Sequence, residues 1–98
     1  MSAKGILQEV RRVAHEVLHG HDVAVYLFGS WAKGEQRQSS DIDLAVDSHQ
    51  PLPQGTLAIL RERFEESRIP YIVDVVDLSE ADEAFRAKVR GEGIRWSV

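Results

Sequence analysis

Residues 29–46 read GSWAKGEQRQSSDIDLAV, and this stretch decides how the chain folds. It follows an apolar, β-prone run at residues 23–28, VAVYLF, which is typical of a buried strand. The run leads directly into Gly29, a residue that can take the backbone angles of a sharp turn. A polar loop comes next, and a second strand begins near Ser40. We therefore expect two neighbouring strands joined by a turn and a loop.

The turn between these strands carries groups that suit a phosphate. Ser30 is placed to cap a short helix over residues 31–33, and Gly34 is placed to end it. The start of a helix presents backbone N–H groups, and a serine adds a hydroxyl. Lys33 and Arg37 add positive charge nearby, at positions that an ordinary polar loop would also fill. The turn is thus a candidate phosphate site.

The second strand contains two carboxylates, Asp41 and Asp43, separated by Ile42. Side chains two residues apart on a strand share one face, so both aspartates point the same way. Two like charges held this closely repel each other, and burial increases the cost. A divalent cation relieves the repulsion, since Mg²⁺ takes carboxylate and phosphate oxygens as ligands. Carboxylates for a metal beside amides for phosphate indicate nucleotide chemistry.

The Gly-Ser turn and the Asp-x-Asp pair resemble the signature of the DNA polymerase β-like nucleotidyltransferase superfamily. The spacing is most similar to that of the minimal nucleotidyltransferase domains of prokaryotes, G-S-x-A-[RK]-G-x5-S-D-x-D-L. The matching residues are Gly29, Ser30, Ala32, Lys33, Gly34, Ser40, Asp41, Asp43 and Leu44. The competing interpretation is a surface turn followed by an Asp-rich strand edge.

The resemblance implies a set of site residues. The superfamily places a third carboxylate between apolar residues on the next strand, and Asp74 holds that place within residues 71–78. By resemblance, the catalytic residues and ligands of two Mg²⁺ ions are Asp41, Asp43 and Asp74. The residues that would bind ATP are Gly29, Ser30, Lys33 and Ser40.

The rest of the chain supplies helices and one more strand. Apolar residues at helical spacing predict helices at 3–19 and 54–67, and a β-branched run predicts a strand at 71–78. Residues 79–82, SEAD, resemble a capping box that opens a last helix. The predicted class is α/β (α+β), in the order αβ(turn)βαβα, with a small mixed three-stranded sheet. We expect the helices mainly on one face and the carboxylates in an open cleft on the other.

Composition limits the choice of function. The chain of 98 residues fits one domain, residues 1–98. A net charge of −4 argues against direct nucleic-acid binding, and the absence of cysteine excludes disulfides and thiolate metal sites. No apolar run approaches the roughly 18 residues of a membrane helix, and the N-terminus lacks a signal-peptide core. We expect a cytoplasmic protein that does not enter a membrane.

The resemblance implies a Mg²⁺-dependent protein adenylyltransferase that moves AMP from ATP to a tyrosine hydroxyl. Minimal domains of this family are typically paired with a small helical HEPN toxin, for which they act as the antitoxin. The alternative is a weakly active or inactive binding module that neutralises its partner by occlusion. Trp31 and Trp96 are either contacts with a partner or core residues, and the sequence leaves the oligomeric state open.

Overall fold

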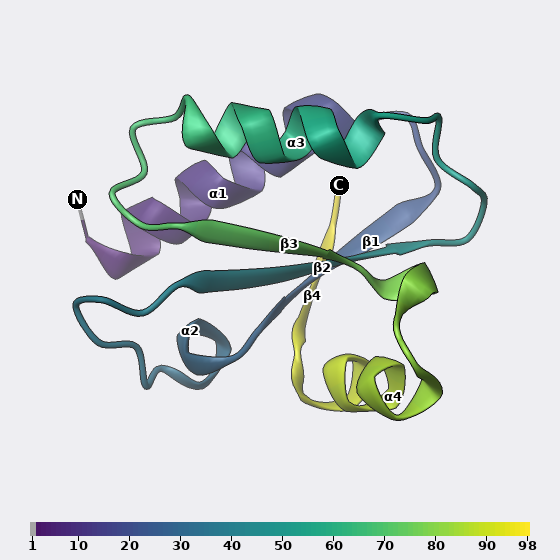
Figure 1. The fold of residues 1–98 in the computed structure, drawn as a ribbon. Helices are drawn as coiled ribbons and strands as arrows, with labels where there is room; N and C mark the ends of the chain where they lie inside the picture. Colours follow the sequence, from purple (N-terminus) through teal and green to yellow (C-terminus); the bar gives the residue numbers. More distant parts are fainter. Residues whose placement is uncertain (1) are drawn as a thin grey trace.

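The computed structural model describes residues 2–98, which form helices on both sides of one four-stranded sheet (Figure 1). The predicted mixed α/β class is confirmed, and the predicted number of strands is one too low. In chain order the elements are α1 (Ala3–Leu18), β1 (Val23–Phe28), α2 (Ser30–Lys33), β2 (Ile42–Ser48), α3 (Thr56–Glu65), β3 (Val73–Asp77), the 3-10 helix η1 (Leu78–Glu80), α4 (Glu83–Glu92) and β4 (Ile94–Ser97).

The sheet has the strand order β3-β2-β1-β4. The sheet is mixed, as predicted: β1 and β2 are antiparallel, and β2 and β3 are parallel because α3 carries the chain back between them. The unpredicted strand β4 pairs antiparallel with the free edge of β1. It is four residues long, and only Trp96 in it is buried, so its sequence carries little strand signal. Trp96 is therefore a core residue.

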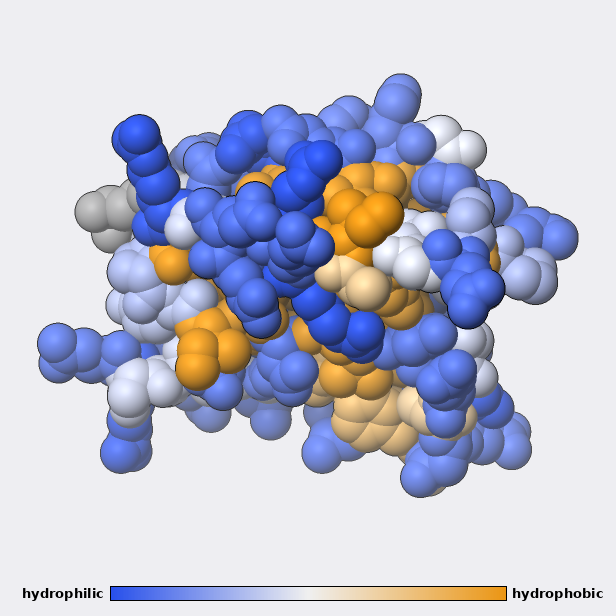
Figure 2. All heavy atoms as spheres, turned by 45° about the horizontal axis from the view of Figure 1, so that its top comes forward, coloured by the Kyte–Doolittle hydropathy of each residue, from blue (hydrophilic) through white to orange (hydrophobic). Residues whose placement is uncertain are grey.

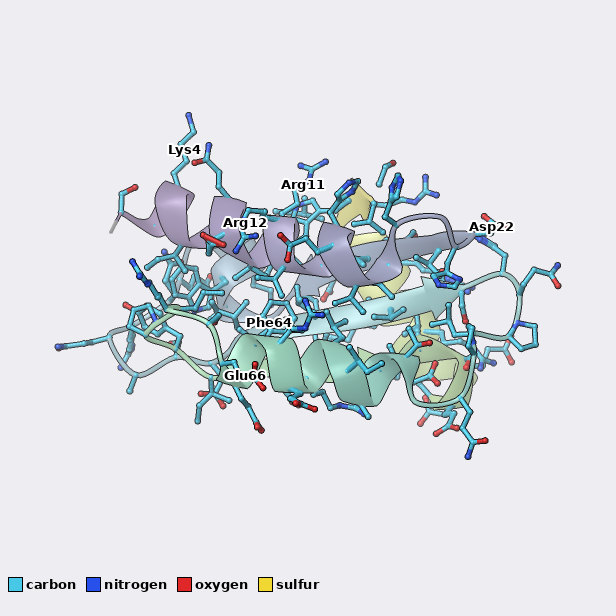
Figure 3. The ribbon with its side chains drawn as sticks, turned by 90° about the horizontal axis from the view of Figure 1, so that it is seen from above. Lys4, Arg11, Arg12, Asp22, Phe64 and Glu66 are labelled. Atoms are coloured by element: carbon cyan, nitrogen blue, oxygen red, sulfur yellow. The ribbon has the colours of Figure 1, made fainter. Side chains whose placement is uncertain are left out.

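The main core lies between the sheet and two helices, α1 and α3. Seen from above, these helices lie side by side over the sheet, with Phe64 of α3 between them (Figure 3). The residues of this core that solvent does not reach include Val10, Ala14, Leu18, Val25, Ile42, Leu44, Val46 and Leu60. Their alternation along β1 and β2 leaves the intervening residues on the opposite face of the sheet.

The opposite face is covered in part by α4, so the expectation that helices lie mainly on one face is wrong (Figure 1). Ala24 and Ala45 leave room there, and Val89 of α4 packs in the same buried cluster. Asp47 of β2 accepts two hydrogen bonds from the guanidinium of Arg90, at 3.0 and 3.1 Å. Because Asp47 is buried, this paired geometry satisfies a carboxylate that would otherwise be costly to bury.

Several helix ends differ from the sequence prediction. The helix α2 begins at Ser30 itself and has Gly29 as its N-cap, so Ser30 is not a side-chain cap. The predicted capping box at 79–82 is also wrong, because α4 is capped by Asp82, which accepts from the Phe85 N–H at 2.7 Å. Both differences shift a helix start by one to three residues, which is the usual uncertainty at helix ends.

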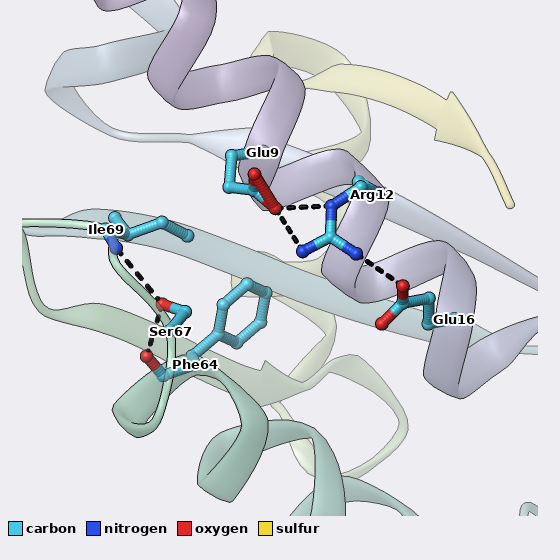
Figure 4. Close-up of polar contacts among 6 residues, drawn as sticks. All are labelled: Glu9, Arg12, Glu16, Phe64, Ser67 and Ile69. Atoms are coloured by element: carbon cyan, nitrogen blue, oxygen red, sulfur yellow. Dashed lines mark hydrogen bonds and ion pairs between the residues drawn. The ribbon is translucent and has the colours of Figure 1, made fainter. Parts of the chain in front are cut away.

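Polar contacts stabilise the turn after α3, and ion pairs lie on the exposed surface of α1 (Figure 4). The Ser67 hydroxyl donates to the Phe64 carbonyl at 2.6 Å and accepts from the Ile69 N–H at 3.3 Å. Arg12 of α1 pairs with Glu9 and Glu16 one turn away on either side. The α1 pairs are exposed, so they contribute little to stability, whereas the Ser67 bonds fix the path into β3.

The surface over α1 and α3 is mostly hydrophilic, with apolar side chains showing only in limited areas (Figure 2). Large apolar side chains that are exposed within residues 2–98 are Ile59, Ile72 and Ile94. No helix in the described part of the chain is long and apolar enough to cross a membrane.

Two glycines near the end of α4 differ in the space around them. A Cβ on Gly93 would lie 2.6 Å from the Val89 carbonyl oxygen, whereas a Cβ on Gly91 meets nothing within 4 Å. We expect Gly93→Ala to lower the free energy of unfolding by about 1–3 kcal/mol through overpacking. Gly91→Ala should raise it by up to about 1 kcal/mol, because alanine is the better helix former. Urea denaturation measures both, and equal effects would contradict the close packing at Gly93.

Candidate active site

The three predicted carboxylates meet at one end of the sheet. In the strand register, Asp43 of β2 pairs with Phe28 of β1 on one side and with Asp74 of β3 on the other. Residues paired in this way point to the same face, so Phe28, Asp43 and Asp74 form a row across three strands. Asp41 directly precedes β2, two residues before Asp43. Asp41 and Asp74 are exposed and Asp43 is half-buried, so the row is open to solvent.

Gly29 makes room for this row. Its backbone has φ 74° and ψ −155°, a region that is essentially restricted to glycine. A Cβ at this position would lie 2.4 Å from the Asp43 Oδ2 atom. Gly29 is therefore required twice, by the backbone angles of the turn and by the carboxylate packed against it. The turn places the first residues of α2 beside Asp43.

The loop that leads from α2 to β2 is fixed by Trp31 and Ser40. Trp31 is buried, its indole N–H donates to the Ser40 carbonyl at 3.2 Å, and its ring packs edge-on against Tyr71 at 5.0 Å. The Ser40 hydroxyl accepts from the Arg37 N–H at 2.8 Å. Trp31 is thus a core residue that holds the start of β2. Ser40, expected to bind nucleotide, has a positioning contact just before Asp41.

Electrostatics set Asp43 apart from the other acids. Burial raises the pKa of the Asp43 carboxyl above its ordinary value of 3.8, and the charges of Asp74 and Asp41 raise it further. The three groups are therefore close enough to repel one another through partly desolvated surroundings. The Asp-x-Asp spacing predicts repulsion between Asp41 and Asp43, and Asp74 of β3 adds a third carboxylate to it.

The donor set fits a hard divalent cation. Carboxylate oxygens are the ligands that Mg²⁺ prefers, and the raised pKa of Asp43 marks a site where positive charge is favourable. Within residues 2–98, no three acidic or histidine side chains already converge as closely as a metal site requires. Asp43 and Asp74 nevertheless occupy paired strand positions, and the charges of Asp74 and Asp41 both act on Asp43. The residue types and their neighbouring strand positions fit Mg²⁺.

A pocket of about 220 Å³ adjoins the row, between α2 and α4. Its lining includes Phe28, Gly29 and Lys33, together with Phe85 and Lys88 of α4. Lys33 is exposed and borders this pocket, so it lies on the site side of α2 as the sequence suggests. The α4 residues were not predicted as site residues. Their spacing along α4 marks one helix face, and nothing in the sequence links that face to Asp43.

The whole arrangement matches a known protein family. The polymerase beta nucleotidyltransferase family matches residues 12–95, which include every site residue named above. The chain belongs to this family. A match of this extent covers all four strands, apart from the last two residues of β4. The predicted fold and family are confirmed together.

Individual relatives agree with the family. The probable protein adenylyltransferase MntA of Haemophilus influenzae is 41% identical over 69 residues, which cover 70% of this chain and 60% of that protein. The match therefore spans less than two thirds of the relative's length. A solved structure assigned as a minimal nucleotidyltransferase superposes with a TM-score of 0.76 at 28% identity, covering 96% of this chain and 95% of the other. A toxin–antitoxin structure with AMP-PNP gives 0.69 at 28% identity, covering 90% and 73%.

The double requirement at Gly29 gives a coupled prediction. Gly29→Ala should lower the free energy of unfolding by about 1–3 kcal/mol, since it strains the backbone and displaces the Asp43 carboxylate. Gly34→Ala is the matched control, because Gly34 also has a positive φ of 69° but open space around it. Urea denaturation should show that Asp43→Ala reduces the cost of Gly29→Ala and not that of Gly34→Ala. Equal costs in both backgrounds would contradict the contact.

The raised pKa of Asp43 gives a pH-dependent prediction for metal-free protein. A carboxyl whose pKa is higher in the folded state destabilises the fold once pH exceeds its ordinary value of 3.8. Asp43→Asn should therefore raise the melting temperature at pH 7 in EDTA, and this gain should vanish as pH falls below that value. Asp22→Asn, at an exposed position, should show no such gain. A gain that persists at low pH would mean that charge is not the cause.

Proposed function

We propose that this chain is a Mg²⁺-dependent nucleotidyltransferase that moves AMP from ATP to a tyrosine hydroxyl of a helical HEPN-type toxin, and so acts as its antitoxin. The observation that carries the proposal is the row of Asp43 and Asp74 across β2 and β3, with Asp41 before it and the Gly29 turn beside it. In this arrangement, carboxylate oxygens lie next to the Gly29 turn, and the residues after that turn carry backbone N–H groups that can donate to phosphate. Family membership supports the same chemistry.

In this proposal Asp41, Asp43 and Asp74 hold two Mg²⁺ ions. Bound Mg²⁺ supplies Lewis acidity, which lowers the pKa of the acceptor hydroxyl and neutralises charge on the phosphate oxygens. The half-buried position of Asp43 strengthens its attraction to positive charge, because water screens it less than the exposed acids. Asp41 and Asp74 neighbour Asp43 in two different directions, one along the chain and one across the sheet.

The turn would hold the β- and γ-phosphates. The Ala32 and Lys33 N–H groups already donate to the Gly29 carbonyl, at 3.2 and 3.3 Å. The preceding N–H groups, of Ser30 and Trp31, come before the first bond within the helix, as at any helix start. With the Ser30 hydroxyl they form the donor set of the turn, and Lys33 adds charge beside it. Ser40 would act by holding the loop before Asp41, in keeping with its bonds to Arg37 and Trp31.

The proposed reaction is a single displacement at the α-phosphorus of ATP. The acceptor oxygen forms a bond to that phosphorus while the bond to the bridging oxygen of pyrophosphate breaks. The hydroxyl proton passes to solvent, and pyrophosphate leaves with the electron pair of the broken bond. The products are an AMP ester of the acceptor and pyrophosphate. The chain's residues orient the triphosphate and hold its charge, and no side chain needs to act as a separate base.

The relatives support the choice of acceptor. One is named as a protein adenylyltransferase, and another belongs to a toxin–antitoxin structure containing an ATP analogue. An acceptor on a second protein fits a row of carboxylates that is open to solvent, since Asp41 and Asp74 are exposed. Occlusion of the toxin without chemistry is the competing function, and it requires neither the row of carboxylates nor the glycine that accommodates it.

Mass spectrometry tests the proposal directly. This protein, ATP and Mg²⁺ are incubated with the helical protein encoded beside it, and the helical protein is then weighed. We expect a mass gain of one or more AMP units, which Asp41→Asn abolishes and the exposed control Asp22→Asn leaves intact. The loss should exceed about 100-fold in rate, because a ligand of the reacting centre is removed. A tight complex with no mass gain would leave occlusion as the better account.

A further inference from the structure

The pocket between α2 and α4 has a volume and a lining that suit an aromatic ring. It measures about 220 Å³ and is bordered by Phe28, Ala32 and Phe85. The two phenylalanine rings meet edge to face, with centroids 5.6 Å apart and planes at 85°. Both side chains are only partly buried, so apolar ring surface remains open to the pocket. Aromatic surface of this kind binds nucleobases by stacking.

The pocket also lies at the right place relative to the carboxylates. Phe28 is the direct strand partner of Asp43, so the floor of the pocket and the centre of the carboxylate row are adjacent side chains. In a nucleoside triphosphate only the ribose separates the base from the α-phosphate. A base in this pocket is therefore within reach of an α-phosphate held at Asp43, while Gly29 and Lys33 border both the pocket and the proposed phosphate site.

The rim of the pocket offers one donor and one acceptor. Lys88 and Glu92 lie four residues apart on α4, on the same helix face as Phe85. The adenine ring presents an amino group next to ring nitrogens that accept hydrogen bonds. A carboxylate can accept from the amino group, and an ammonium group can donate to a ring nitrogen. The rim thus complements the edge of the base, and the phenylalanines complement its faces.

We propose that this pocket binds the adenine ring of ATP, with Phe28 and Phe85 contacting the ring and Glu92 accepting from its amino group. The inference rests on the proposed function, because it takes the nucleotide to be the ligand of the neighbouring carboxylates.

A larger groove, of about 620 Å³, runs along the β3 edge and also borders Asp74. Its lining comes from α3, β3 and the segment between them, and does not include Asp43. The two aromatic residues in it are already engaged, because Phe64 is buried in the core and Tyr71 packs edge-on against Trp31.

Calorimetric titration in Mg²⁺ tests this assignment with three compounds. ATP has the full base, purine riboside triphosphate has the same ring without the amino group, and inorganic tripolyphosphate has neither base nor ribose. The variants are Phe85→Leu, which keeps an apolar side chain, and Glu92→Ala, at an exposed position. Glu83→Ala is the matched control, since Glu83 is exposed in the first turn of α4 and does not line the pocket. Thermal denaturation confirms that each variant is folded.

We expect Phe85→Leu to weaken ATP binding about tenfold and to leave tripolyphosphate binding within about twofold. Glu92→Ala should bring ATP down to the affinity of purine riboside triphosphate, and Glu83→Ala should change nothing. The inference is overturned if ATP binds no more tightly than tripolyphosphate, or if both pocket variants keep the full advantage of ATP. A failure of the proposed function looks different: tripolyphosphate would then show no Mg²⁺-dependent binding that Asp41→Asn removes.

Discussion

The repulsion among three carboxylates at one end of the sheet is the constraint on which the site depends. The strand register holds Asp43 between Phe28 and Asp74. Backbone hydrogen bonds therefore fix its position, rather than a positively charged partner of its carboxylate. Its raised pKa records the cost of that position. Gly29 combines a positive φ with a close approach of the Asp43 carboxylate, which fills the space where a side chain would begin. The turn and the acid are therefore one structural unit.

That cost is tolerated because the other face of the same strands carries the core. Ile42 and Leu44 flank Asp43 in β2, and both are fully buried against α1 and α3. Each buried aliphatic side chain of this size contributes roughly 1.5–3 kcal/mol. The alternation of a strand thus lets one segment serve stability and chemistry at once, on opposite faces. It also explains why the site needs a rigid sheet, since a shift of one residue in register would exchange the two faces.

The sequence predicts the parts of this structure that depend on local pattern. Strands β1, β2 and β3 follow from apolar runs, and the pairing of Asp41 with Asp43 follows from the two-residue repeat of a strand. The inclusion of Asp74 came from the family resemblance, and the register then placed it beside Asp43. Strand β4 and the pocket residues of α4 were missed for a physical reason. Both depend on where the chain packs after Asp82, and Phe85, Lys88 and Glu92 read locally as an ordinary amphipathic helix.

Two aspartates of β2 have contrasting electrostatic surroundings. Asp43 and Asp47 lie four residues apart on the same strand, so both point to the face that α4 partly covers. Asp47 is the more buried, yet its charge is met by two hydrogen bonds from Arg90. Burial raises the pKa of the Asp43 carboxyl, and its acidic neighbours Asp74 and Asp41 raise it further. The fold therefore pairs the buried carboxylate of Asp47 with Arg90, whereas the half-buried Asp43 is surrounded by like charge, as the proposed cation site requires. Helix α4 supplies Arg90, which pairs with Asp47, and also Phe85, whose ring packs against Phe28. The same helix therefore pairs the charge of Asp47 and lines the pocket next to Asp43.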